Sequence, residues 1–95
     1  MTKTSEAVRN HLLEQIDETD AIQLEKVDRY EALLESFEEM TRLINEAGTS
    51  IVVKNGGQEY LKANPLIGER NKVSAQMLSI EKSLNLSGTK TDELL

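Results

Sequence analysis

One long stretch, residues 20–47, most constrains how this chain can fold. Its apolar residues recur three and four positions apart, which predicts a single α-helix of about 27 residues, roughly 40 Å long. They fall on two adjacent lines, a stripe too wide for a two-stranded seam, so the helix needs at least two apolar neighbours. The first line contains Val27, Tyr30, Leu34, Phe37 and Ile44, and the second contains Leu33, Met40 and Ala47.

Local signals mark both ends of this helix and a shorter helix before it. Asp20 followed by Gln23 has the form of a capping box, and Gly48 stands where helices commonly end on a glycine. Residues 5–16 predict a short amphipathic helix with Ser5 as its N-cap. Three turns are marginal alone in water, so this helix must dock on another element.

After the long helix the pattern changes from helix to strand. Residues 49–54 are rich in β-branched side chains, and Asn55-Gly56-Gly57 is a strong turn signal. Residues 58–62 can return as a second strand, so the sequence predicts a small β-hairpin. A lone hairpin is barely stable in water, and it must therefore lie against helices or a neighbouring subunit.

Asn64 and Pro65 predict the cap and first residue of a last helix that runs to about Asn85. Its apolar residues match the spacing of the long helix, which favours an antiparallel helical hairpin with the β-hairpin between its two helices. The predicted fold is thus mainly α, with a short N-terminal helix before the hairpin. Three segments follow: an N-terminal helix and linker, an oligomerisation core and a tail, at residues 1–19, 20–86 and 87–95.

The composition predicts a soluble intracellular protein that associates with itself. The 95 residues include no cysteine, which excludes disulfides and thiolate metal sites, and no apolar run approaches the ~18 residues of a membrane span. The start of the chain does not lead into a signal-peptide core. The apolar side chains of the two long helices are too few to stabilise that pair alone, so we predict a homo-oligomer. The candidate subunit interface comprises Leu33, Met40, Ala47, Ile51 and Val53.

Few residues suggest catalytic or metal chemistry. The single histidine, His11, has no second histidine or cysteine with which to share a metal, and no Ser–His–Asp set can be assembled around it. The carboxylates of the long helix lack the Glu-x-x-His motifs of bundle metal sites, which favours a solvated acidic face. Asn55-Gly56-Gly57 lacks the Gly-Lys-Ser/Thr ending of a phosphate loop. The sequence therefore predicts no catalytic residue, no metal and no cofactor.

The charges are unevenly distributed. Residues 1–50 carry five Lys/Arg against twelve Asp/Glu, whereas residues 51–90 carry six against three. An anion-binding surface should therefore lie in the second half, and several phosphates could be met at once in a symmetric oligomer. Scattered solubilising charges are the competing interpretation. The candidate DNA-binding residues are Lys54, Lys62, Arg70, Lys72 and Lys82.

The order of these elements resembles the small subunit of tailed-phage terminases, over residues 22–87. The resemblance rests on a long helix with Tyr30 in its first part and on short motifs that follow in order. These are Glu46-Ala47-Gly48, Ile51-Val52-Val53, Asn55-Gly56-Gly57, Asn64-Pro65 and Leu84-Asn85-Leu86-Ser87. The chain departs from the family after the last helix: Asn85 stands at a usual glycine, Ser87-Gly88 replaces a Thr-Pro pair, and no arginine follows.

The resemblance implies a non-catalytic subunit of the phage genome-packaging motor. Small terminase subunits form rings of identical subunits, recognise the double-stranded phage genome and present it to the large subunit, which holds the ATPase and nuclease. The implied partners are therefore other copies of this chain, the large subunit and phage DNA, in the cytoplasm of the host bacterium and without a membrane. A different class stays open from the residues alone: a helical scaffold or inhibitor that does not bind DNA.

Overall fold

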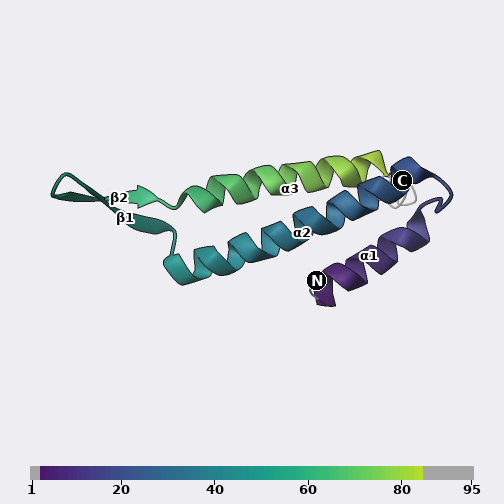
Figure 1. The fold of residues 1–95 in the computed structure, drawn as a ribbon, viewed down its shortest axis with the longest axis horizontal. Coiled ribbons are helices and arrows are strands. Elements are labelled where there is room, and N and C mark those ends of the chain that lie inside the picture. Colours follow the sequence, from purple (N-terminus) through teal and green to yellow (C-terminus); the bar gives the residue numbers. More distant parts are fainter. Residues whose placement is uncertain (1–2, 85–95) are drawn as a thin grey trace, which may run out of the picture.

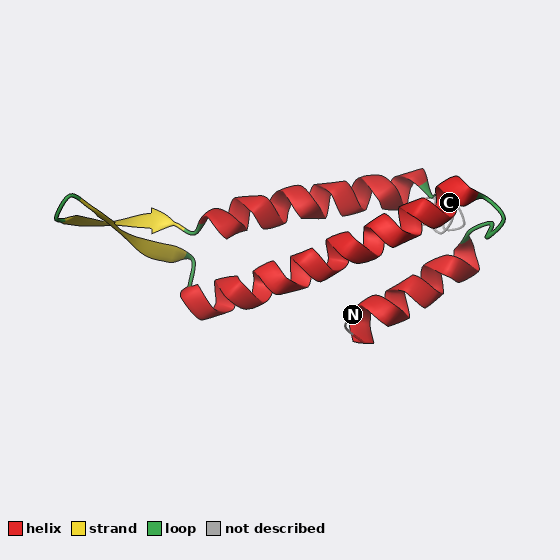
Figure 2. Cartoon of the chain, in the orientation of Figure 1, coloured by secondary structure: helices red, strands yellow, loops and turns green. Residues whose placement is uncertain are grey.

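The computed structural model of the chain describes residues 3–84. These residues form three helices and one two-stranded antiparallel sheet (Figure 2). The predicted mainly α class with a small β-hairpin is confirmed, while the predicted tail and residues 85–87 of the closing motif lie outside the described residues. The elements are α1 (Lys3–Gln15), α2 (Ala21–Ala47), β1 (Ser50–Asn55), β2 (Gln58–Ala63) and α3 (Pro65–Ser83).

Helix α2 lies in the middle, with α1 packed on one side and α3 on the other, while the β-hairpin projects beyond the helices (Figure 1). In the first half of α2, Tyr30 donates a hydrogen bond to Glu81 near the end of α3. In the second half of α2, Thr41 accepts one from Arg70 near the start of α3. The molecule measures 58 × 32 × 21 Å, and its radius of gyration of 17.7 Å exceeds the roughly 12 Å of a compact domain of this length. The chain is therefore elongated and has a large surface for its size.

The predicted ends of α2 are confirmed. The Asp20 carboxylate accepts hydrogen bonds from the backbone N–H of Ile22 (2.9 Å) and of Gln23 (3.4 Å), and the Gln23 side chain donates back to it (3.3 Å). At the other end Gly48 has φ +90°, a conformation that favours glycine, and its N–H donates to the Ile44 carbonyl at 2.7 Å.

The two strands pair directly through a two-residue turn. Gly56 and Gly57 both have positive φ (57° and 87°), as a type I′ turn requires, because its twist matches that of the strands. The register runs from Asn55 opposite Gln58 to Ser50 opposite Ala63. Residues directly opposite each other lie on the same face of a sheet, so this register fixes which side chains share a face.

Asn64 joins the base of the β-hairpin to both long helices. Its side-chain oxygen accepts from the Leu66 N–H at 3.0 Å, which caps α3, and its amide nitrogen donates to the Gly48 carbonyl at 3.0 Å. Its backbone N–H donates to the Thr49 carbonyl at 2.9 Å. The side chain is buried, so these bonds are shielded from water. The predicted Asn64-Pro65 helix start is thus confirmed.

The core is small. Among the described residues the buried apolar side chains are Leu12, Val27 and Ile44, and no residue of α3 is buried.

The prediction that Ser5 is an N-cap is wrong, because α1 begins at Lys3. Ser5 is instead buried inside the helix, and its hydroxyl donates to Glu35 at 3.5 Å. A serine side chain is small enough to let α1 approach α2 closely.

Candidate functional site

The β-hairpin places two of the five candidate DNA-binding residues on opposite faces. Lys54 lies opposite Glu59, and Lys62 lies opposite Ile51, one residue out of phase along the strands. Both lysines are exposed, and the Lys54 ammonium lies 3.6 Å from the Glu59 carboxylate. Within one chain, the two charges therefore point to different sides.

Arg70 is held inside the contact between α2 and α3. Its guanidinium donates to the Thr41 hydroxyl at 3.1 Å and lies over the Phe37 ring, 5.6 Å from the centroid. The side chain is half-buried. In this conformation Arg70 stabilises the contact between the two helices, and its charge is only partly accessible to solvent.

The remaining two candidates lie on the exposed side of α3. Lys72 pairs with Glu69 one turn earlier at 3.3 Å, and Lys82 lies in the last turn, where the helix dipole favours a cation. Ten residues separate them, which is about 15 Å along the helix axis. One chain therefore distributes the five candidates over the hairpin, the helix contact and the outer face of α3.

The candidate subunit-interface residues are divided between α2 and the β-hairpin. Leu33 and Met40 are half-buried on α2, and Ala47 is exposed at its last turn. Ile51 and Val53 are half-buried on one face of the hairpin. The more exposed apolar residues of the hairpin, Val52 and Leu61, lie on its other face.

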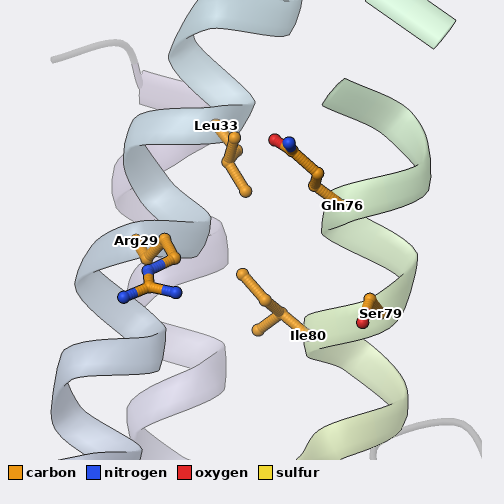
Figure 3. A pocket seen from close by; sticks show the side chains of 5 residues that line it. All are labelled: Arg29, Leu33, Gln76, Ser79 and Ile80. Atoms are coloured by element: carbon orange, nitrogen blue, oxygen red, sulfur yellow. The ribbon is translucent and has the colours of Figure 1, made fainter. Parts of the chain in front are cut away.

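An open cavity of about 310 Å³ lies between α2 and α3. Leu33 and Ile80 point into it from the two helices, and Gln76 and Ser79 line it from α3 (Figure 3). Arg29 stands on the α2 side, where its guanidinium pairs with Glu25 at 2.9 Å. The long helices thus leave apolar surface between them that their own side chains do not fill.

A charged cluster, absent from the sequence-based candidates, fixes α1 on α2. The Arg9 guanidinium lies 2.5 Å from the Asp28 carboxylate and 3.3 Å from that of Glu31. The hydrogen bond with Asp28 raises the pKa of Arg9 above its usual value. Glu31 is only 8% exposed, and its second carboxylate oxygen has no hydrogen-bond partner among the described residues. Arg9 lies four positions after Ser5 and therefore on the same face of α1. This spacing was a signal that Arg9 faces α2.

The phenol of Tyr30 bridges α2 and α3 by donating to the Glu81 carboxylate at 2.7 Å. Burial and, secondarily, this hydrogen bond raise the pKa of Tyr30 well above its ordinary value. Beside it, the Lys26 ammonium donates to the Ser83 hydroxyl. These polar contacts hold the end of α3 against the start of α2.

Neither metal-binding clusters nor membrane spans occur in the described part of the chain. No three His, Cys, Asp or Glu side chains between residues 3 and 84 are grouped as metal ligands would be, and His11 is exposed on α1. None of the three helices is long and apolar enough to cross a membrane.

Comparison with known proteins identifies the family. The family described as phage terminase, small subunit, matches residues 7–94, nearly the whole chain. The curated proteins and the solved structures that were searched gave no match. The elements that carry the resemblance, from the long helix through the hairpin to α3, lie inside the matched range. The chain therefore belongs to the small-subunit family of phage terminases.

Proposed function

We propose that this chain is the non-catalytic DNA-recognition and regulatory subunit of a phage genome-packaging motor. The family match over residues 7–94 carries this proposal. The chain acts as a homo-oligomeric ring with the large ATPase and nuclease subunit, in the cytoplasm of the host bacterium. It needs no cofactor and supplies no catalytic residue of its own.

The small core supports assembly. Only three apolar side chains within residues 3–84 are buried, which is few for a chain of this length. Residues 20–86 form the oligomerisation core, in which α2 and α3 act as a helical hairpin. Residues 1–19 form an appended helix and linker. The proposed subunit interface includes Leu33, Met40, Ala47, Ile51 and Val53.

DNA contact comes from the exposed lysines of the hairpin and α3. Lys54, Lys62, Lys72 and Lys82 are exposed, and a ring repeats each of them once per subunit. Repetition brings together charges that one chain keeps apart, so several phosphates are met at once. The strongly acidic α2 faces away from the DNA in this arrangement. Arg70 contributes by holding α3 in place.

Native mass spectrometry with and without the matching phage DNA tests this function. The expected result is one defined assembly of more than two subunits, which binds the DNA with an affinity that falls steeply between about 50 and 200 mM salt. A matched control DNA of equal length from another source separates recognition from general binding. A monomer or dimer that ignores DNA even at ~50 mM salt would favour the other class, a helical scaffold or inhibitor.

A further inference from the structure

One face of the β-hairpin carries an apolar pair that nothing in the described chain covers. Val52 and Leu61 lie directly opposite each other, and they are 59% and 72% exposed. Adjacent exposed apolar side chains on a protruding element are typical of an interaction site, and a two-stranded hairpin gains stability when such a face is covered. The next pair toward the turn on the same face is charged, with Lys54 opposite Glu59.

The cavity between α2 and α3 has a matching layout. Leu33 and Ile80 supply its apolar walls (Figure 3), and the ion pair of Glu25 with Arg29 lies beside it. Its volume of about 310 Å³ is ample for an aliphatic side chain, since about 150 Å³ accommodates a benzene ring. An apolar centre flanked by one acid and one base thus occurs on both surfaces.

The hairpin of a chain cannot reach the cavity of the same chain. Asn64 fixes the base of the hairpin, and the strands project away from the helices (Figure 1). The cavity lies farther back along the helix pair, where residues 29–33 face residues 76–80. Only a second copy of the chain can therefore bring the two surfaces together.

We propose that the Val52–Leu61 face of one copy docks into the α2–α3 cavity of the next, with Glu59 against Arg29. This inference rests on the proposed function, because it names the surfaces by which the subunits assemble. The two surfaces differ, so the contact is head-to-tail, and successive copies close into a ring where the rotation per subunit allows. Leu33, already a proposed interface residue, then meets the hairpin of the neighbour.

Leu61→Glu tests the hairpin side of the contact. Burying a leucine contributes enough that its replacement by a charge should weaken self-association at least tenfold, measured by light scattering and native mass spectrometry. Ile22→Glu is the matched control, since Ile22 is 68% exposed on α2 and lies outside the proposed contact. Both variants should retain the helical circular dichroism of the wild type. Equal assembly of Leu61→Glu and Ile22→Glu would overturn the proposal.

Mixing two defective variants tests the pairing of the surfaces. Gln76→Trp fills the cavity from an exposed position of α3, while its hairpin stays intact. Alone, each of Leu61→Glu and Gln76→Trp should be monomeric. Together they retain one working hairpin and one working cavity, so native mass spectrometry should show a 1:1 heterodimer that grows no further. A mixture that stays monomeric, or that rebuilds the full assembly, would show that these two surfaces are not partners.

The charged flank gives a smaller, independent effect. Glu59→Lys places a cation opposite Arg29 of the next copy and should weaken association several-fold, and Arg29→Glu in the same chain should restore it. No restoration in the double variant would remove the charge pairing from the proposal. A wild-type assembly that binds DNA but is insensitive to all these changes would refute this contact while leaving the proposed function intact. A wild type that is monomeric and ignores DNA would refute both.

Discussion

The two sides of α2 are covered in different ways. On one side the 13 residues of α1 place Ser5 and Leu12 in buried positions and bring Arg9 against the buried Glu31. On the other side the 19 residues of α3 include no buried residue and leave a cavity of about 310 Å³. The longer helix therefore does not bury its contact with α2 more completely than the shorter one. The small Ser5 allows a close approach, whereas Tyr30 and Arg70 fill their side with long polar side chains.

The largest contrast should come from shortening one apolar side chain on each side. Leu12 is 3% exposed, so Leu12→Ala should lower the free energy of unfolding by about 2–4 kcal/mol. Ile80 is half-buried beside the cavity, and Ile80→Ala should cost about 1 kcal/mol. Urea unfolding at one fixed protein concentration measures both, because assembly adds to apparent stability. Equal costs would mean that the two sides are packed alike.

Removing the cation from the α1 side should have the next largest effect. Arg9→Gln leaves the Glu31 carboxylate buried without its charged partner, at a cost of about 1–3 kcal/mol. Arg9→Lys keeps the charge and should cost less, and Glu31→Gln added to Arg9→Gln should recover part of the loss. Hydrogen exchange in residues 3–15 should rise first. If the double variant is no more stable than Arg9→Gln, the ion pair is not what fixes α1.

The α3 side should be sensitive to alkaline pH through Tyr30. Because its pKa is raised in the folded chain, the unfolded chain loses the phenol proton first, near pH 10. This contribution to stability is complete below pH 10 and is lost as the pH rises further. A Tyr60→Phe background leaves Tyr30 as the remaining tyrosine for an absorbance titration. Tyr30→Phe should cost about 1 kcal/mol at pH 7 and abolish this pH dependence; an unchanged profile would contradict the assignment.

Two basic residues of α3 should separate packing from DNA contact with the smallest effects. Arg70→Gln should lower the free energy of unfolding by about 1 kcal/mol, since it loses the Thr41 hydrogen bond and the contact with Phe37. Lys72→Gln should change it by less than about 0.5 kcal/mol and should instead reduce the salt dependence of DNA binding. The opposite pattern would assign Arg70 to the DNA.

Local signals predicted the elements and their order well. Three signals act through hydrogen bonds and dihedral angles within a few residues: Asp20 with Gln23, Gly56-Gly57, and Asn64-Pro65. Because these interactions are local, the neighbouring sequence alone was enough to predict where the helices and the turn begin. Ser5 was assigned wrongly because a serine near a helix start suits a cap equally well as a close helix contact.

The environment of individual side chains was harder to predict. Arg70 contacts residues 29 and 33 positions earlier, and Arg9 contacts residues 19 and 22 positions later. Local spacing can indicate which face of a helix such a residue lies on, but it does not identify these distant partners. The β-hairpin register also decides that Lys54 and Lys62 point to opposite sides, which a count of basic residues does not show. The predicted DNA and subunit surfaces consequently stay proposals about the assembled protein.

The hydrogen bonds of Asn64 couple the orientation of the β-hairpin to that of α3. The same side chain accepts a hydrogen bond from the Leu66 N–H, which caps α3, and donates one to the carbonyl of Gly48, the residue that follows α2. Tilting the hairpin relative to the helices would therefore strain one or both of these bonds. A second copy of the chain that binds the hairpin would therefore also influence the angle between α2 and α3. That angle determines the direction in which the lysines of α3 point.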